Sequence, residues 1–439
     1  MRSFVKGVFL SLAFILLFVS CGETGKKDTG KPEGSEGGPC YGNKTCDDGL
    51  VCEDGVCVDS EKVTDKDTGD TADDGNSGDS GDTGGDDFSN SSECVGDVWA
   101  GDFVLTDQDD VAEIAKYVAV TGNFYVKDSD FVNVHLLKLC EIGGDVIFDN
   151  SKFLADFSAP KLLLIGGNIA LNGNVPSTVN LSKLSNIGGN MSFSNNSSAF
   201  VVDLASLVSV GGDLTISNNK IAGLLTWPKL KSVDGNLYIT SNHYDSFSFP
   251  DLQNIVGEFR IQSNSLLLSF TFPKLNSVGS VSVASNGLLD SIDFSTVEVV
   301  AGSVQIGGNG LLKSLDFSKL KTVGEDFSIS NSPVIMELDL PQLISVGGGF
   351  ILHSNESLGF FSASLLKSVG SIYVGQSVYE DGNHLLESFN LPYLSRVVGV
   401  FSFKYNLLLP TSSVESLRDL VLSRDGIGGE VVILGNKSE

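Results

Sequence analysis

The segment GGDLTISNN at residues 211–219 combines two glycines, an alternating apolar pair and two asparagines, and near-copies of it recur along the chain. Copies begin at residues 143, 166, 188, 234 and 256, so the repeat is about 22 or 23 residues long. A fixed period of this length is typical of a solenoid, in which each repeat forms one coil and packs on the next. Aligning the repeats from residue 121 to residue 406 predicts about thirteen coils.

Each repeat contains two short strand patterns. The first alternates apolar and polar residues, as at Leu214 and Ile216, which predicts a strand with one buried face. The second half of each repeat, such as SFSFPDLQNI at residues 246–255, predicts a second strand and a corner. The chain is therefore expected to be all-β, a right-handed parallel β-helix or leucine-rich-repeat-like solenoid. Aromatic side chains in this second half are expected to pack in the core, with an exposed carbohydrate-stacking strip as the alternative: Trp227, Phe247, Phe249, Phe270, Phe272, Phe294, Phe317 and Phe389.

The glycine pairs stand directly before a strand, where the backbone must bend tightly, and we expect them to adopt positive φ. A phosphate-binding loop would need a helix N-terminus after the glycines, but a strand pattern follows them. Asparagines fall in register after each strand. We expect them to form an internal ladder of hydrogen bonds between neighbouring coils: Asn174, Asn196, Asn219, Asn242, Asn264, Asn286, Asn309 and Asn355.

LKSVDGNLYITSN at residues 230–242 resembles the leucine-rich repeat L-x-x-L-x-x-L-x-L-x-x-N with one extra residue. This variant is similar to the receptor L-domain family, the β-helical ligand-binding domains of insulin and epidermal growth factor receptors, which also occur in fungal cell-wall and bacterial surface proteins. The resemblance covers roughly residues 94–436 and implies a role in ligand recognition. Because there are more coils than one such domain usually has, one long array and two fused domains both remain open.

Both ends of the array carry helical patterns, which predict helical caps. TDQDDVAEIAKYVAV at residues 106–120 has acidic residues at its start and apolar residues at helical spacing, as in the opening helix of the family. PTSSVESLRDLVLSR at residues 410–424 contains a capping box from Ser412 to Glu415. GEVVILGNK at residues 429–437 is then expected to form a final strand. A disulfide between Cys94 and Cys140 is expected to join the first cap to the second coil.

Residues 1–20 are typical of a secretory signal, because Arg2 and Lys6 precede an apolar run too short to span a bilayer. LLFVSCG at residues 16–22 resembles a bacterial lipoprotein box, which implies cleavage before Cys21 and its lipidation; an ordinary signal peptide is the alternative. Residues 21–39 are then a lipid-anchored flexible linker. Gly22 and Glu23 stand directly after Cys21, where an aspartate would favour retention at the inner membrane, so we expect the protein at the outer membrane or cell surface.

The other six cysteines are an even number, which in an exported chain indicates disulfides. Residues 40–57 hold four of them and predict a small disulfide module, with Cys40–Cys52 and Cys46–Cys57 favoured among the open pairings. Zinc binding is disfavoured because no histidine precedes His135 and the spacing is not C-x-x-C.

Residues 58–93 contain twelve acidic residues and two lysines and predict a disordered acidic linker. The spacing of its aspartates does not match a calcium-binding EF-hand loop. The residues from 94 to 439 follow it as the repeat solenoid. The net charge of −27 makes nucleic acid an unlikely partner.

The outward positions of the repeats carry small hydroxyl and amide side chains without a cluster of catalytic carboxylates and bases, so we expect no enzymatic activity, cofactor or metal. A stiff, flat sheet of this kind suits recognition or adhesion through an extracellular glycan or protein ligand. The alternatives are a structural envelope spacer and a diverged glycan-cleaving β-helix enzyme. An insertion at residues 377–384 predicts a protruding loop and a contact site. The candidate binding residues are Thr215, Tyr238, Arg260, Gln305, Tyr379, Glu380 and Asp381.

Overall fold

A computed structural model describes residues 50–53, 56–59, 94–127, 132–149, 154–173, 177–197, 200–375 and 382–438. The chain divides into two compact units, Met1–Asp87 and Phe88–Glu439. In the first unit, β1 (Leu50–Glu53) and β2 (Val56–Asp59) pair antiparallel, and Cys52 lies opposite Cys57. Residues 1–49, with Cys21, Cys40 and Cys46, and residues 60–93 lie outside the described residues. Lipidation, the pairing of the four-cysteine module and the disorder of the acidic linker stay predictions.

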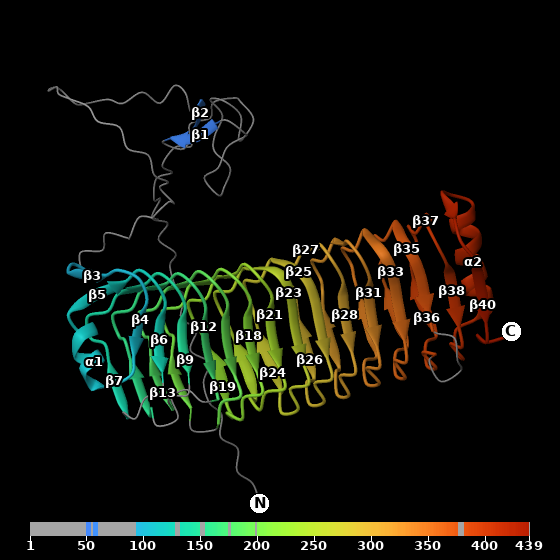
Figure 1. The fold of residues 1–439 in the computed structure, drawn as a ribbon. Coiled ribbons are helices and arrows are strands. Elements are labelled where there is room, and N and C mark those ends of the chain that lie inside the picture. The colour runs from blue at the N-terminus through green and yellow to red at the C-terminus, as the bar shows by residue number, and fades with distance from the viewer. Residues whose placement is uncertain are drawn as a thin grey trace, which may run out of the picture. The chain divides into compact units, whose positions relative to one another are not determined.

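The second unit is a parallel β-solenoid of about 12 turns, close to the thirteen predicted (Figure 1). One 26-stranded sheet runs through the whole unit, so the coils form a continuous array. Neighbouring strands pair in register at the repeat period, as in Leu214 with Leu237 and Ile216 with Ile239. Each coil contributes two strands to this sheet, separated by the glycine corner or fused into one longer strand.

The strands of this first sheet are β3 (Asp97–Trp99), β4 (Phe103–Leu105), β5 (Tyr117–Val120), β6 (Phe124–Lys127), β8 (Glu141–Ile142), β9 (Val146–Asp149), β11 (Leu164–Ile165), β12 (Ile169–Asn172), β14 (Asn186–Ile187), β15 (Met191–Ser194), β17 (Ser209–Val210), β18 (Leu214–Ser217), β20 (Ser232–Val233), β21 (Leu237–Thr240), β23 (Asn254–Gln262), β25 (Ser277–Ala284), β27 (Val299–Val300), β28 (Val304–Gly307), β30 (Thr322–Val323), β31 (Phe327–Ser330), β33 (Ser345–His353), β35 (Ser368–Val374), β37 (Arg396–Val397), β38 (Phe401–Lys404), β39 (Gly426–Ile427) and β40 (Val431–Leu434).

The second half of each coil forms three-residue strands on the other side of the core, as predicted. They group into four short parallel sheets: β7 (Asn133–His135), β10 (Asp156–Ser158), β13 (Thr178–Asn180) and β16 (Val201–Asp203); β19 (Leu224–Thr226), β22 (Ser246–Ser248) and β24 (Ser269–Thr271); β26 (Ser291–Asp293) and β29 (Ser314–Asp316); β32 (Glu337–Asp339), β34 (Phe360–Ser362) and β36 (Ser388–Asn390).

The core is one hydrophobic cluster that extends along the array. Seven of the eight aromatic residues singled out from the repeats are buried in it, and Phe389 is partly buried against it. Rings of successive coils stack, as in Phe294 and Phe317, whose centroids are 5.3 Å apart. The aromatic columns therefore pack the interior and do not form an exposed carbohydrate-stacking strip.

Asparagines line the interior after each four-residue strand and bond to the coils on both sides. The Nδ2 group of Asn242 donates to the Ile216 carbonyl at 2.9 Å and to Asn264 Oδ1 at 3.1 Å. Its own Oδ1 accepts from the backbone N and the Nδ2 of Asn219, at 3.1 and 2.9 Å. These side chains are fully buried, so the bonds satisfy turn backbone that water cannot reach. The same pattern joins Asn196, Asn219, Asn242, Asn264, Asn286 and Asn309 in one series.

After Asn309 the series changes, because Ser332 occupies the next asparagine position. It resumes from Asn355 through Asn383 and Asn406 to Asn436, three members that the repeat alignment missed. Asn383 lies within the segment 377–384 predicted to protrude, yet it is buried, so the insertion ends before it. Tyr379, Glu380 and Asp381, and also Asn174, lie outside the described residues, and the contact site at this loop stays a prediction.

The glycine corners work differently from our expectation of positive φ. Positive φ falls on the residue just before a ladder asparagine, as at Asn218, Ser241 and Ser263, and the paired corner glycines do not have it. A Cβ at Gly211 would collide with the carbonyl of Gly188 in the preceding coil, and one at Gly212 with Oδ1 of Asn190. Glycine suits these corners because neighbouring coils approach so closely there that an added Cβ would have to displace backbone or side-chain atoms, although some coils carry another residue, such as Asp234 or Glu325.

The predicted disulfide is confirmed: Cys94 and Cys140 are bonded, with their Cα atoms 5.9 Å apart. The predicted helix near the first coil forms as α1 (Gln108–Ile114), which is shorter than the pattern suggested, because Val118 belongs to β5. Asp107 caps α1 by accepting from the N–H groups of Asp109 and Asp110. No helix among the described residues is long and apolar enough to cross a membrane.

Helix α2 (Thr411–Leu422) forms near the other end and inserts Val414, Leu417 and Val421 into the core. The predicted capping box from Ser412 to Glu415 is wrong, because α2 starts after Pro410 without a side-chain cap. Its first N–H, from Thr411, donates instead to the carbonyl of Lys437 at 3.0 Å. The predicted last strand forms as β40. That the two helices close the ends of the core stays a prediction.

Replacing Asn242 by alanine is expected to lower the free energy of unfolding by about 3 kcal/mol, because it removes the side-chain donor to the Ile216 carbonyl and the acceptor of the buried Asn219 backbone N–H. Urea denaturation followed by circular dichroism measures the change. Asn254→Ala is the matched control: Asn254 is exposed, and its loss should change stability by less than about 0.5 kcal/mol. Equal effects of the two substitutions would contradict the ladder.

Replacing Gly235 by alanine is expected to destabilise the fold by about 2 kcal/mol, because the added methyl collides with Asp213 Oδ1 and the Gly212 backbone. Gly287 provides the control, since nothing lies within 4 Å of a Cβ placed there. Gly287→Ala should be neutral or stabilise by about 0.5 kcal/mol through the unfolded chain. Thermal melting of both variants tests whether the corner needs glycine at position 235. An unchanged melting temperature for Gly235→Ala would contradict this expectation.

Candidate binding face

The outer face is formed by the outward side chains of the four-residue strands of the first sheet and of the longer strands that contain them. Thr215, Tyr238, Arg260 and Gln305, predicted from four separate repeats, lie in one row across β18, β21, β23 and β28. Register pairs connect them: Thr215 with Tyr238, Tyr238 with Arg260, Arg260 with Ser282 and Ser282 with Gln305. Their strand neighbours at alternate positions are buried, so these side chains point to solvent.

Arg260 is held in place by two neighbours. Its Nε and Nη2 donate to the two carboxylate oxygens of Glu258, at 3.0 and 2.7 Å. Its guanidinium carbon lies 5.2 Å from the centroid of the Tyr238 ring on the adjacent strand, a cation–π distance. The guanidinium is thus oriented from two directions, and its charge is balanced by the carboxylate at its side.

Sequence reasoning missed Glu258, although the signal was present. Glu258 and Arg260 are two residues apart on β23, so their side chains lie on the same face of the sheet. Glu258 also occupies a position at which the preceding repeats have Asn or Asp, and the longer glutamate is therefore an exception to the repeat.

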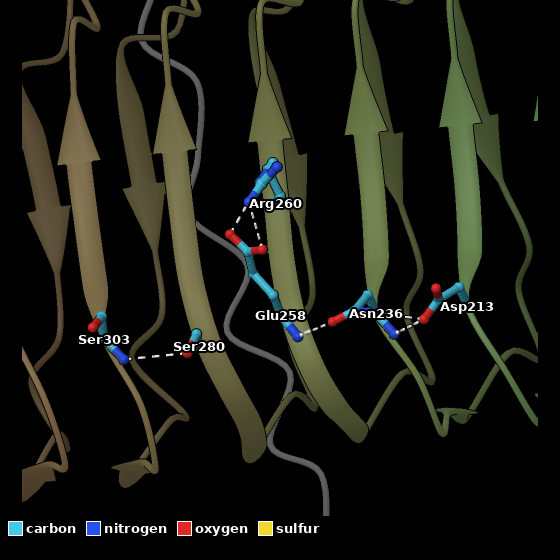
Figure 2. Close-up of polar contacts among 6 residues, drawn as sticks. All are labelled: Asp213, Asn236, Glu258, Arg260, Ser280 and Ser303. Carbon is cyan, nitrogen blue, oxygen red and sulfur yellow. Dashed lines mark hydrogen bonds and ion pairs between the residues drawn. The ribbon is translucent and has the colours of Figure 1, made fainter.

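That position forms a second, partly exposed ladder along the corner of the array. Asp213 Oδ1 accepts from the N–H of Asn236 at 2.7 Å, and Asn236 Oδ1 accepts from the N–H of Glu258 at 2.7 Å. At Glu258 the side chain turns to Arg260 instead of to the next coil, and the ladder continues with serine hydroxyls, from the N–H of Ser303 to Ser280 Oγ at 3.2 Å (Figure 2). The interruption of this ladder is what frees the Glu258 carboxylate to hold Arg260.

The pKa of the Tyr238 phenol is raised by partial burial, and the Glu258 carboxylate raises it further, whereas the Arg260 cation lowers it. No group of three His, Cys, Asp or Glu side chains that could hold a metal ion occurs in the part of the chain that the structure describes. The outer face offers hydrogen-bonding side chains together with the planar ring of Tyr238.

The chain matches no protein-family model. It also matches no curated protein. The receptor L-domain relationship accordingly stays a proposal.

Replacing Arg260 by alanine is expected to raise the pKa of Tyr238, because the lowering cation is lost while the Glu258 carboxylate remains. Glu258→Gln should shift the pKa in the opposite direction, because it removes the anion and leaves the guanidinium over the ring. Ultraviolet difference titration against Tyr238→Phe isolates this phenol in each background. An unchanged pKa in both variants would show that the three groups are not coupled.

Proposed function

We propose that this chain is a noncatalytic cell-envelope lipoprotein whose solenoid recognises a glycan or protein ligand outside the cell. The observation that carries the proposal is the outer face, where hydroxyl, amide and guanidinium groups lie in rows on a rigid sheet. Neighbouring strands in a sheet lie about 4.8 Å apart, so about 12 turns present a surface of roughly 55 Å in length. A long surface with many weak, evenly spaced contacts suits recognition of an extended partner.

The other parts of the proposal come from the sequence. The N-terminal signal pattern and Cys21 support export and lipid anchoring at the outer membrane or cell surface, and the polar segments before residue 94 are suited to act as a tether. The receptor L-domain-like repeats support ligand recognition. A recognition role requires no cofactor or metal.

The proposal is tested by binding of the purified chain, with Cys21→Ser to remove the lipid acceptor, to arrays of purified envelope glycans and surface proteins. Saturable binding that soluble ligand competes for is expected. Arg260→Ala is expected to weaken binding to a ligand that contacts the row, whereas Lys319→Ala, an exposed change on a turn outside the outer face, is the control. Absence of saturable binding on both arrays would overturn the recognition role and favour the structural spacer. Release of shorter fragments from the glycans would instead favour an enzyme.

A further inference from the structure

Beside Arg260, the outer face is hollowed because small side chains replace large ones in two adjacent rows, with Gln305 as the one long side chain between them. The first row runs Arg260, Ser282, Gln305, Ser328 and Ile351. The second runs through Gln262, Ala284, Gly307, Ser330 and His353. Small residues in β25 and β31, and Gly307 in β28, thus lie between bulkier ones in β23 and β33.

The resulting depression, here called the trough, is lined by residues of β25, β28, β31 and β33 together with Asp326. Its volume is about 370 Å³, which lies within the range of sites that bind small molecules, roughly 300–1,000 Å³. Four adjacent strands span about 14 Å from first to last. The trough therefore has the length to receive several units of a chain molecule laid across the strands.

Polar groups of the trough are available to a ligand. The hydroxyls of Ser282, Ser328 and Ser330 and the amide of Gln305 make no side-chain hydrogen bond within the described part of the chain. Each hydroxyl both donates and accepts, and the amide does both as well. Asp326 uses Oδ1 to accept from the N–H of Gly349 at 2.7 Å, which fixes its carboxylate at the edge of the trough.

The charges around the trough select against an anion. Arg260, the cation of the adjoining strand, is already paired with Glu258 at 2.7 Å, so it offers no net positive charge. Asp326 adds a negative charge to the lining. An acidic polysaccharide or a phosphate group would meet this charge without a compensating cation.

The lining also lacks what a protein partner needs. Binding energy between proteins concentrates where an aromatic or arginine anchor fills a desolvated apolar pocket. In the trough the apolar side chains facing solvent are Ala284 and Ile351, and the remaining floor is hydroxyl, amide and the backbone of Gly307. Sugars present closely spaced hydroxyls together with small C–H surfaces, which matches this mixture.

We propose that the trough binds a neutral, hydroxyl-rich polysaccharide chain that lies across β25, β28, β31 and β33. The proposal rests on the recognition role above and narrows its ligand class to neutral glycans. In this arrangement Ser282, Gln305 and Ser328 exchange hydrogen bonds with sugar hydroxyls, while Ala284, Gly307 and Ile351 contact the C–H faces of the rings.

Titration calorimetry of the chain carrying Cys21→Ser tests the proposal with four neutral probes, cellohexaose, mannohexaose, xylohexaose and chitohexaose, and with hexagalacturonate as the anionic comparison. Saturable binding of at least one neutral probe, and none of hexagalacturonate, is expected. Ala284→Arg fills the trough from an outward position and should weaken that binding more than about tenfold. Ala170→Arg, an exposed substitution in β12 of the same face, is the matched control and should leave it unchanged.

A milder variant keeps the test decisive if Ala284→Arg disturbs folding. Gln305→Ala removes one amide from the trough and should weaken binding about three- to tenfold, whereas Gln342→Ala, outside the outer face, should not. Failure of all four neutral probes, preferential binding of hexagalacturonate, or equal binding by the trough variants and their controls would overturn the proposal. If the arrays then still show saturable binding to a surface protein, recognition stands and only the glycan trough fails.

Discussion

In most coils of this protein, a buried asparagine donates to a carbonyl group in the four-residue strand of the preceding coil. Asn219, Asn242 and Asn264 donate in this way to the carbonyls of Phe193, Ile216 and Ile239, and each accepts from the asparagine of the coil before. Since each amide uses both its donor and its acceptor between neighbours, the bonds require each coil to place this position at the same depth. The spacing of 22 or 23 residues between the asparagines from Asn196 to Asn309 fits that requirement.

The glycine corner before each four-residue strand is constrained by the short distance between neighbouring coils. Coils approach so closely at the glycine pair that the backbone of Gly188 and the side chain of Asn190 occupy the positions where Gly211 and Gly212 would carry a Cβ. The same Asn and Asp side chains bond the next coil through its N–H groups. The corner glycine and the Asn or Asp therefore act together. Because glycine has no side chain, the carboxamide or carboxylate of the preceding coil fits against it.

The outer face gains its distinctive groups where this corner ladder of Asn and Asp side chains is interrupted. At Glu258 the carboxylate leaves the corner ladder and orients Arg260 against Tyr238. Beyond that point, small residues at Ser282, Ala284 and Gly307 lower the surface into the trough. Regular coils supply a rigid platform, and departures from the repeat give one part of it a distinct shape and charge. This division of roles connects the fold to the proposed recognition of a glycan.

The amino-acid sequence by itself determined the parallel solenoid, the inward columns of apolar and aromatic residues and the asparagine register, because a repeated pattern shows which positions share an environment. It also indicated the bond between Cys94 and Cys140, because an even number of cysteines in an exported chain predicts disulfides. The tertiary structure alone decided features that depend on contacts between coils. Asn383 joins the ladder after an insertion that shifts the period, and Thr411 meets Lys437 instead of a local cap. The strand register also decides which side chains become neighbours on the outer face. It therefore places the trough between Arg260 and Ile351, next to the pair of Glu258 and Arg260.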